Sequence, residues 1–502
     1  MAKVKTGATQ NSNHLLNRKI KFMIQQLDLP KQFIDEIRDI LGDNEANQLI
    51  ESIQKEPSVS IRLNPHKGMN AMVWCALPFS EVYNEPYERV PWNSTFGIYL
   101  PKRPDSFTLD PLFHGAAYYV QEASSMALGV FKNHLGNRPI RALDLCAAPG
   151  GKATLLQDIL PKGSMLVANE VISNRAAILS ENMKKWGYPN TIVTSADPKD
   201  LSEIGPWFDL ILVDAPCSGE GMFRKDPEAI AEWSVKNVER CVERQREIID
   251  NAWKMLKPGG MIIYSTCTYN KYENEDQVNY MLQQLNAEKV DLDTTGWPDE
   301  LLKAVEPIKG AKTETFAMRF MPHRTKGEGL FMAAVKKPGE LTTEEEQEKK
   351  KGSKIQQEEI PLYVKNWLKH PDDFIFSTMP DGIIHAIPKV ITTTLEKLQK
   401  MHVRLLQAGI DFAEVKGKNY APAGTLAHSI ELDEDSFDRV DICRTEAQHY
   451  LKREAITLAN DANVGYIVIT YAFVPLGFMK NIGNRANNLY PHEWKIRMEL
   501  KE

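Results

Sequence analysis

Between residues 141 and 335 the sequence alternates short apolar runs with amphipathic stretches, and this alternation constrains the fold more than any other feature of the chain. Short apolar runs bounded by turn signals are typical of buried strands, and the stretches between them carry the apolar spacing of helices. This order predicts a doubly wound α/β fold, a parallel sheet with helices on both faces. We expect strands at residues 141–145, 165–169, 191–195, 208–213 and 261–265, helices at 174–186 and 238–256, and a closing strand at 331–335.

The segments on either side of this core have different sequence patterns. Helical periodicity at residues 20–27, 33–41 and 44–53, followed by an alternating segment at 58–65, predicts a small N-terminal α/β unit. A run of charges of both signs separates the core from 142 C-terminal residues, whose last part alternates like a β-rich module. We therefore expect domains at residues 1–95, 96–337, 361–430 and 431–502, with a charged linker at 338–360.

Cysteine, histidine and charge content exclude several classes of protein. Six scattered cysteines without a CxxC pair do not suit a disulfide framework or a zinc knuckle, and no HExxH motif occurs, so we expect no metal and a reducing, cytoplasmic setting. The longest apolar run, residues 466–479, is too short to span a bilayer, so we expect no membrane partner. The net charge of −6 does not indicate nucleic-acid binding. Residues 1–31, however, carry six Lys or Arg against the single Asp28, which permits a local basic face.

The first motif with chemical content is LDLCAAPGGK at residues 143–152, where a buried strand runs into a glycine turn and then a helix. Glycines allow the backbone to approach a ligand closely, and a helix N-terminus favours a carboxylate or phosphate. Glu170 closes the next predicted strand, 20 residues after Gly150, the distance at which α/β folds hold a ribose diol. Asp197 closes the third strand and is a candidate to receive an adenine amino group. The motif predicts a nucleoside-type cofactor, with an ordinary βαβ turn as the alternative.

Two further motifs follow the last two predicted strands of the sheet, DAPCSGEG at residues 214–221 and STCTY at 265–269. Ligands bind outside the carboxyl ends of such strands, so Asp214, Cys217 and Cys267 are expected to converge on one crevice if the strands are neighbours. Two thiols and a carboxylate beside a cofactor suggest thiolate addition to an electrophilic ring. A thiol with a pKa of about 8.5 needs a positive environment to ionise, and Lys152 is a candidate for that charge. The residues alone do not decide which thiol is the nucleophile.

The alternative for any cysteine is that it is buried and inert, and we accept this for Cys75, Cys241 and Cys443. Cys146 is expected to pack beneath the cofactor loop. A cysteine hydrolase is possible in principle, but no histidine lies in either thiol motif, so nothing identifies a Cys–His pair.

Together these segments resemble the NOL1/NOP2/Sun family of S-adenosylmethionine-dependent RNA cytosine-C5 methyltransferases. The resemblance rests on LDLCAAPGGK, on DAPCSGEGMFRKD at residues 214–226 and YSTCTYNKYENE at 264–275, and on SIRLNP at 60–65 and YYVQEASSMA at 118–127. The GEGMFRKD continuation and LGFMKNIGNRANNLYPHEW at 476–494 are similar to the RsmF branch, which modifies small-subunit ribosomal RNA. The resemblance implies a Rossmann-like class I methyltransferase core, a small N-terminal α/β domain and a C-terminal β-rich, PUA-like domain.

The resemblance also implies a role for each candidate residue. Cys267 would be the nucleophile that adds to C6 of cytosine, Cys217 would help to release the product, and Asp214 would contact the N3/N4 edge of the base and border the cofactor. Glu170 would hold the ribose of S-adenosyl-L-methionine and Asp197 its adenine. The methionine part would lie against the loop formed by Cys146, Ala147, Ala148, Pro149, Gly150, Gly151 and Lys152. Ala153 replaces the Thr of many members, with little expected effect because Thr154 follows.

We therefore expect a 5-methylcytosine RNA methyltransferase, a cytoplasmic monomer that acts on small-subunit (16S) rRNA. Two alternatives stay open: the same chemistry on tRNA, and a non-catalytic RNA-binding ribosome-assembly factor, which would not need both thiols. The basic N-terminal segment would contact phosphates. Further RNA contacts are expected in the C-terminal domain, where the two aromatic residues could equally fill a small barrel core: Lys480, Arg485, Asn487, Asn488, Tyr490 and Trp494.

Overall fold

The computed structural model describes residues 27–69, 71–77, 87–308, 315–341, 355–401, 403–458 and 462–500. Most of the basic N-terminal segment, almost all of the helix expected at residues 20–27 and much of the charged linker lie outside the described residues. Within the described ranges, no helix is both long enough and apolar enough to cross a membrane.

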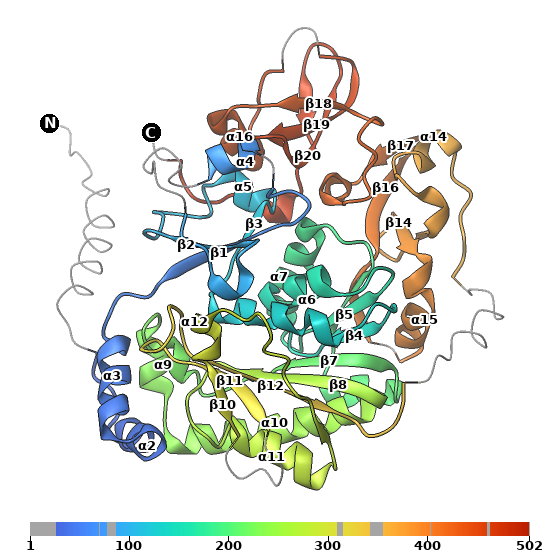
Figure 1. Ribbon diagram of the computed structural model, residues 1–502. Helices are drawn as coiled ribbons and strands as arrows, with labels where there is room; N and C mark the ends of the chain where they lie inside the picture. The colour runs from blue at the N-terminus through green and yellow to red at the C-terminus, as the bar shows by residue number, and fades with distance from the viewer. Residues whose placement is uncertain are drawn as a thin grey trace, which may run out of the picture.

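A large mixed sheet forms the centre of the molecule (Figure 1), in the strand order β10-β11-β12-β8-β7-β4-β5-β6-β15. Its middle is parallel and consists of the five predicted strands, β4 (Arg141–Asp144), β5 (Met165–Asn169), β6 (Thr191–Ser195), β7 (Phe208–Asp214) and β8 (Leu256–Thr266). The closing strand is β12 (Leu330–Lys336), and it is antiparallel to β8. Three more antiparallel strands complete this side, β11 (Phe316–Phe320), β10 (Val305–Pro307) and the short β9 (Glu288–Lys289).

Helices cover both faces of this sheet, as the amphipathic stretches predict. One face packs against α6 (Gly151–Ile159), α7 (Ser173–Trp186) and the 3₁₀ segment η2 (Ser124–His134). The other face packs against α10 (Val235–Met255), α11 (Glu275–Gln284) and α15 (Thr392–Lys400). Three short helices lie in the connections, α8 (Pro198–Leu201), α9 (Pro227–Glu232) and α12 (Asp299–Leu302). The KPGG segment that follows α10, at residues 257–260, lies within the bounds of β8 and interrupts its pairing with β7.

The N-terminal part of the chain divides into two pieces that pack in different places (Figure 1). α2 (Lys31–Leu41) and α3 (Asp43–Ile53) lie against the core, where Phe33 contacts Phe223 and Trp233. A separate antiparallel sheet has the order β2-β1-β3, with α4 (Ala71–Ala76) and α5 (Pro111–His114) in its connections. This sheet crosses the boundary expected after residue 95, because β1 (Val59–Leu63) pairs with β2 (Gly97–Leu100) and β3 (Tyr118–Val120).

The region expected as an intermediate domain is joined to the core. An antiparallel sheet is built from β13 (Phe374–Thr378), β14 (Ile383–Pro388), β16 (Ile410–Lys416) and β17 (Asn419–Pro422), with α14 (Leu362–Lys365) beside it. β15 (Arg404–Ala408), from the same region, instead pairs with β6 and forms the edge of the central sheet. Residues 361–430 therefore do not form an independent unit, because part of their backbone hydrogen bonding belongs to the core.

The last part of the chain is β-rich, as predicted. β19 (Gly465–Tyr471) pairs in parallel with β18 (Asp438–Asp441) and antiparallel with β20 (Val474–Asn481), which also pairs with β21 (Ala486–Asn488), and α16 (Arg444–Leu451) packs against them. Tyr490 and Trp494 are buried in this core, which makes them unsuitable as RNA contacts. Lys480, Arg485 and Asn487 are exposed, whereas the Asn488 side chain donates a hydrogen bond to the Tyr450 carbonyl.

Candidate active site

The predicted cofactor motif forms the loop between β4 and α6, at the carboxyl edge of the parallel strands. Gly150 has φ +120°, a conformation that favours glycine, and α6 begins at the next residue. α7 holds the loop from the side, because Arg175 donates to the Ala148 carbonyl (2.9 Å) and Asn182 to the Pro149 carbonyl (2.8 Å). Within the loop Ala147, Ala148 and Gly150 are buried, Pro149 is exposed, and Cys146, Gly151 and Lys152 are half-buried.

Asp144, the last residue of β4, is a functional candidate that the sequence reasoning missed. Its side chain is fully buried, and within the described residues neither carboxylate oxygen accepts a hydrogen bond of ordinary geometry. Burial, reinforced by the charge of Asp214, raises the pKa of Asp144 well above its usual value. A buried acceptor of this kind requires a donor, and an ammonium group bound at the loop would supply one. Its position at a strand end directly before the loop was the available sequence signal.

The two acidic residues predicted for a nucleoside lie at neighbouring strand ends. Glu170 is buried, accepts a hydrogen bond from the Ile172 amide (2.9 Å), and pairs with Arg175 at 3.3 Å. Asp197 is exposed and caps the N-terminus of α8 by accepting from the Lys199 amide (2.8 Å). The apolar side chain of Val171, which follows Glu170, is 52% exposed, so it is available to a flat aromatic ring.

The N-terminal sheet contacts α6, the helix that follows the cofactor loop, through one buried cation, Arg62 of β1. Its guanidinium donates to Thr154 Oγ1 on α6 (2.6 Å), forms an ion pair with Asp158, and lies 4.5 Å from the ring centroid of Trp186. Arg62 lies within the SIRLNP segment at residues 60–65, whose pattern does not indicate this role. Thr154 Oγ1 thus accepts from Arg62 and donates to the Gly150 carbonyl (2.8 Å), while Ala153 is buried in the core.

The structure brings the two predicted thiols into contact. Cys217 follows β7, Cys267 follows β8, and their Sγ atoms are 3.2 Å apart because β7 and β8 are neighbouring parallel strands. Lys152 from the cofactor loop forms an ion pair with Asp214 (2.9 Å), whose carboxylate also accepts a hydrogen bond from Ser265 (2.7 Å). All four predicted residues of the crevice therefore lie at one edge of the sheet.

The pKa values of the two thiols shift in opposite directions. A hydrogen bond from the Cys217 thiol lowers the pKa of Cys267, and Lys152 lowers it further, although burial and Asp214 act in the other direction. The same hydrogen bond, together with burial, raises the pKa of Cys217 well above the usual value. Burial would lower the pKa of Lys152, but Asp214 outweighs burial and raises it, so Lys152 stays charged. The arrangement favours a thiolate on Cys267 and a proton on Cys217.

A buried network behind the thiols joins their two loops; we call Glu220, Asn270 and Glu273 the carboxylate frame. The side-chain amide of Asn270 donates to Glu220 Oε1 (3.0 Å) and to Glu273 Oε1 (2.7 Å), so it bridges the two carboxylates. Glu220 also accepts from the amides of Tyr269 (2.8 Å) and Asn270 (3.0 Å), and Glu273 accepts from the Ser218 amide (2.9 Å). The frame crosses from one thiol loop to the other and fixes their separation.

The remaining cysteines differ from one another. Burial raises the pKa of Cys146 well above its usual value, so this thiol is protonated beside the cofactor loop. Cys241 is half-buried, but Cys75 and Cys443 are exposed, which corrects the expectation that they are buried. Among the residues that the structure describes, no group of three or more His, Cys, Asp or Glu is arranged to hold a metal ion.

Comparisons with known proteins place these motifs in one family. Residues 136–336 match the description 16S rRNA methyltransferase RsmB/F, residues 29–123 the N-terminal domain of 16S rRNA methyltransferase RsmF, and residues 437–496 the methyltransferase RsmF PUA domain. Ribosomal RNA small subunit methyltransferase F of Enterobacter sp. is 30% identical over 478 residues, which cover 92% of this chain and 95% of the relative. The chain belongs to the RsmF family.

Two other relatives of the same name extend this result. Those of Erwinia tasmaniensis and Vibrio cholerae are each 29% identical, over 92% and 94% of this chain and 96% and 98% of their own length. The predicted RsmF branch, the methyltransferase core and the PUA domain are therefore confirmed, and the chain is an RNA methyltransferase by family.

Solved structures agree with the architecture of the core. A methyltransferase homologue from Pyrococcus horikoshii is 26% identical with a TM-score of 0.51, over 64% of this chain and 99% of that chain. NSun6 from Pyrococcus horikoshii has the same fold, with 20% identity and a TM-score of 0.50 over 63% of this chain and all of that chain.

Proposed function

We propose that this RsmF-family enzyme transfers a methyl group from S-adenosyl-L-methionine to C5 of a cytosine in 16S rRNA, through a covalent adduct between Cys267 and C6. The thiol pair carries the proposal, because two sulfur atoms 3.2 Å apart lie at the strand ends beside the Lys152–Asp214 ion pair. A nitrogen or oxygen acceptor already has a lone pair for methylation and needs no thiol. A ring carbon does need one, because nucleophilic addition at C6 makes C5 reactive.

The residues at the strand ends fit the proposed cofactor. The buried carboxyl group of Asp144 would receive the amino group of the methionine part, and buried Glu170 would receive the ribose hydroxyls. Exposed Val171 and Asp197 would contact the face and the amino group of the adenine. When bound, S-adenosyl-L-methionine supplies an electrophilic methyl group.

The chain's own residues then act on the base. Cys267 adds to C6 as a thiolate, and Asp214 contacts the N3/N4 edge and stabilises the adduct. After C5 has taken the methyl group, its proton passes to solvent water and the C5–H electron pair forms the C5–C6 double bond again. The C6–sulfur bond breaks at the same time, and its electron pair leaves on the Cys267 sulfur. The Cys217 thiol, whose sulfur lies 3.2 Å from that of Cys267, would donate a hydrogen bond to the departing Cys267 sulfur. Stabilising the leaving thiolate is how Cys217 would assist release.

The proposed substrate follows from the relatives, which are named as small-subunit rRNA methyltransferases. The target base must leave its stack to reach the thiols, at a cost of a few kcal/mol that single-stranded or distorted RNA lowers. Exposed Lys480, Arg485 and Asn487 are proposed RNA contacts in the PUA domain. The monomeric state and the cytoplasmic location stay predictions.

The test is methyl transfer from labelled S-adenosyl-L-methionine to 30S subunits, followed by nucleoside analysis, with wild type, Cys217→Ala and Cys267→Ala. We expect labelled 5-methylcytidine with wild type and none with Cys267→Ala, although this variant still binds the cofactor. Cys217→Ala should accumulate a protein–RNA adduct that survives denaturation.

Other outcomes would redirect the proposal. Activity in Cys267→Ala would refute the assignment of the nucleophile. Label in purified tRNA but not in 30S subunits would favour the tRNA alternative. The absence of label in any RNA would favour a ribosome-assembly factor.

A further inference from the structure

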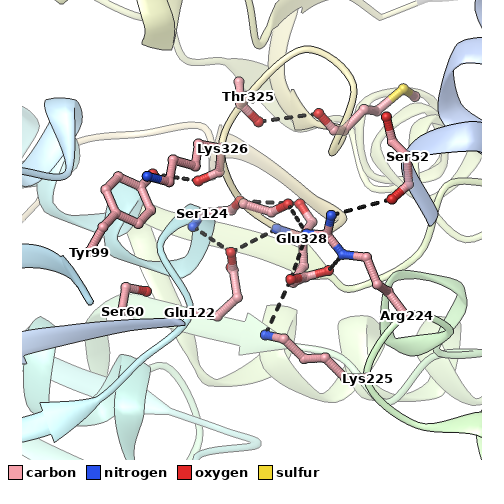
Figure 2. Close-up of polar contacts among 12 residues, drawn as sticks. Ser52, Ser60, Tyr99, Glu122, Ser124, Arg224, Lys225, Thr325, Lys326 and Glu328 are labelled. Carbon is pink, nitrogen blue, oxygen red and sulfur yellow. Dashed lines mark hydrogen bonds and ion pairs between the residues drawn. The ribbon is translucent and has the colours of Figure 1, made fainter. Parts of the chain in front are cut away.

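A second polar network holds the end of the loop that carries Cys217, and its centre is the pair Arg224–Glu328 (Figure 2). Arg224 Nε and Nη2 donate to the two carboxylate oxygens of Glu328 at 2.8 and 2.7 Å, in a two-pronged geometry. The two side chains are only 9% and 3% exposed. Arg224 also donates to the carbonyls of Gly327 (2.9 Å) and Ser52 (3.4 Å), so it reaches both the β11–β12 loop and α3.

Glu328 is itself fixed from the opposite side, by the segment that precedes η2. Its amide donates to Glu122 Oε1 (2.9 Å), which also accepts from the Ser124 amide (2.9 Å), as Figure 2 shows. A Cβ atom added at Gly327 would lie 2.3 Å from Ser124 Oγ, so the two segments are in direct contact. The 327–329 segment therefore has little freedom to move.

This segment touches both thiol loops. A Cβ atom at Gly221 would lie 2.8 Å from the Gly329 carbonyl oxygen and 2.9 Å from that of Cys267. One added at Gly329 would lie 2.4 Å from the ring of Tyr269. The Gly221 amide also donates to the Cys267 carbonyl (2.9 Å). A displacement of residues 327–329 must therefore displace Gly221, four residues after Cys217.

We propose that Arg224 is a positioning residue that holds the Cys217 loop closed on Cys267, and that losing its paired hydrogen bonds to Glu328 slows product release more than adduct formation. The inference rests on the proposed function. The carboxylate frame fixes the loop before Gly221, and Arg224 fixes it after Gly221. Cys267 lies on the other loop, directly after β8, so a shift at Arg224 moves the thiol that assists release away from the thiol that bonds to the base.

The test uses Arg224→Lys in the full-length enzyme. Lysine keeps the charge but cannot form the planar two-pronged contact. Three quantities are measured with 30S subunits: the turnover number, the fraction of enzyme in a denaturation-resistant RNA adduct, and the thermal unfolding midpoint. We expect turnover to fall about tenfold or more, as a small misplacement near the chemistry can cause, while the adduct fraction rises toward that of Cys217→Ala.

Two further variants make the result decisive. Glu328→Asp keeps the charge but withdraws the carboxylate by one methylene, and it replaces Arg224→Lys if that variant does not fold. Lys184→Gln is the matched control, because it breaks a mostly buried ion pair with Asp411 (2.7 Å) that lies between α7 and β16. The control should lower the unfolding midpoint and leave the adduct fraction at the wild-type value.

A loss of turnover without a rise in the adduct fraction would overturn the inference, because Arg224 would then be merely structural. Wild-type turnover and adduct fraction in both variants would also overturn it. If wild type makes no 5-methylcytidine, the proposed function has failed. If wild type is active and Cys217→Ala traps the adduct while Arg224→Lys and Glu328→Asp do not, only this inference has failed.

Discussion

Two buried polar clusters join separate parts of this molecule, and they are built in opposite ways. The carboxylate frame joins the two thiol loops with two acidic side chains that share the donors of Asn270. The second cluster, which we call the basic junction, lies where the N-terminal sheet, α7 and the C-terminal region meet. It consists of Lys67, His114, Lys185 and His428.

The basic junction satisfies its polar atoms less completely than the frame does. Lys67 donates to the carbonyls of Gly115 (3.4 Å) and Lys185, and Lys185 pairs with Glu181 (2.6 Å). His428 packs against Trp494 with ring centroids 5.6 Å apart, but within the described residues neither ring nitrogen has a hydrogen bond of ordinary geometry. Burial lowers the pKa of His114 to about 3, that of His428 well below its usual value, and that of Lys67 to about 7.

The comparison shows that burial of polar groups has different consequences when donors match acceptors and when they do not. In the frame, matched donors fix one geometry, which suits loops that must hold two sulfur atoms in contact. In the junction, burial lowers the pKa values of the two lysines and the two histidines, so the stability of the contact between domains is expected to depend on pH. Four predictions test this contrast.

The largest effect is expected from removing the bridge in the frame. Asn270→Leu has a similar size but leaves two buried carboxylates without their shared donor, so we expect a loss of about 3–5 kcal/mol in the free energy of unfolding. Urea unfolding measures this loss. Asn251→Ala is the control: this half-buried residue of α10 makes only solvent-exposed hydrogen bonds, so the change should alter stability by less than about 0.5 kcal/mol. If Asn270→Leu and Asn251→Ala lowered the free energy of unfolding by similar amounts, the bridge by Asn270 would not be a special source of stability.

The second-largest effect is expected from acid, which should lower the stability that the basic junction contributes. Below pH 6.5 the unfolded chain protonates His114 and His428 while the folded protein keeps them neutral, so stability falls as the pH falls toward about 3. Each histidine contributes a slope of about 1.4 kcal/mol per pH unit. Unfolding free energies at pH 5 and 7 test this, and His428→Leu should remove one histidine's share of the slope. The control is His370→Gln at an exposed position, which should leave the slope of unfolding free energy against pH at the wild-type value. The same unchanged slope in His428→Leu would contradict the prediction.

Lys67 should change the pH dependence of stability above pH 7. Its pKa of about 7 in the folded protein lies below the usual 10.5, so between these values the unfolded chain holds a proton that the folded protein lacks. Stability should therefore rise with pH above 7, by about 1.4 kcal/mol per unit from this group. Lys67→Met should abolish the rise in stability between pH 7.5 and 9. The control is Lys55→Met, at an exposed position two residues after α3, and this variant should retain the rise.

The smallest effect concerns a single hydroxyl beside the junction. Tyr490 is fully buried, and within the described part of the chain its hydroxyl oxygen has no hydrogen-bond partner. Removing an unpaired buried hydroxyl should stabilise, so Tyr490→Phe is expected to raise the free energy of unfolding by about 1 kcal/mol. Thermal unfolding measures the change, and Tyr450→Phe, which loses a hydrogen bond to the Phe478 carbonyl (3.0 Å), should change stability in the opposite direction.

Much of the core could be predicted because its signals are local. The five parallel strands were found within a few residues of their bounds, since each is a short apolar run. The thiol crevice was found because strand ends share one edge of a parallel sheet. The antiparallel pairing of β15 with β6 could not be predicted, because nothing in residues 404–408 specifies a partner more than 200 residues away. Asp144 was missed because its lack of partners is a property of its surroundings.

The sequence by itself therefore determined the five parallel strands of the central sheet, the order of the motifs, the family and the predicted residues of the thiol crevice. These follow from apolar periodicity and from residue types at strand ends, which are properties of contiguous segments. Only the tertiary structure decided that Cys217 and Cys267 share a hydrogen bond, that Asn270 bridges two carboxylates, that Arg224 pairs with Glu328 and that His428 is buried beside Lys67 and Lys185. Hydrogen bonding and burial depend on neighbours brought together from distant parts of the chain, and those neighbours set the pKa of each group.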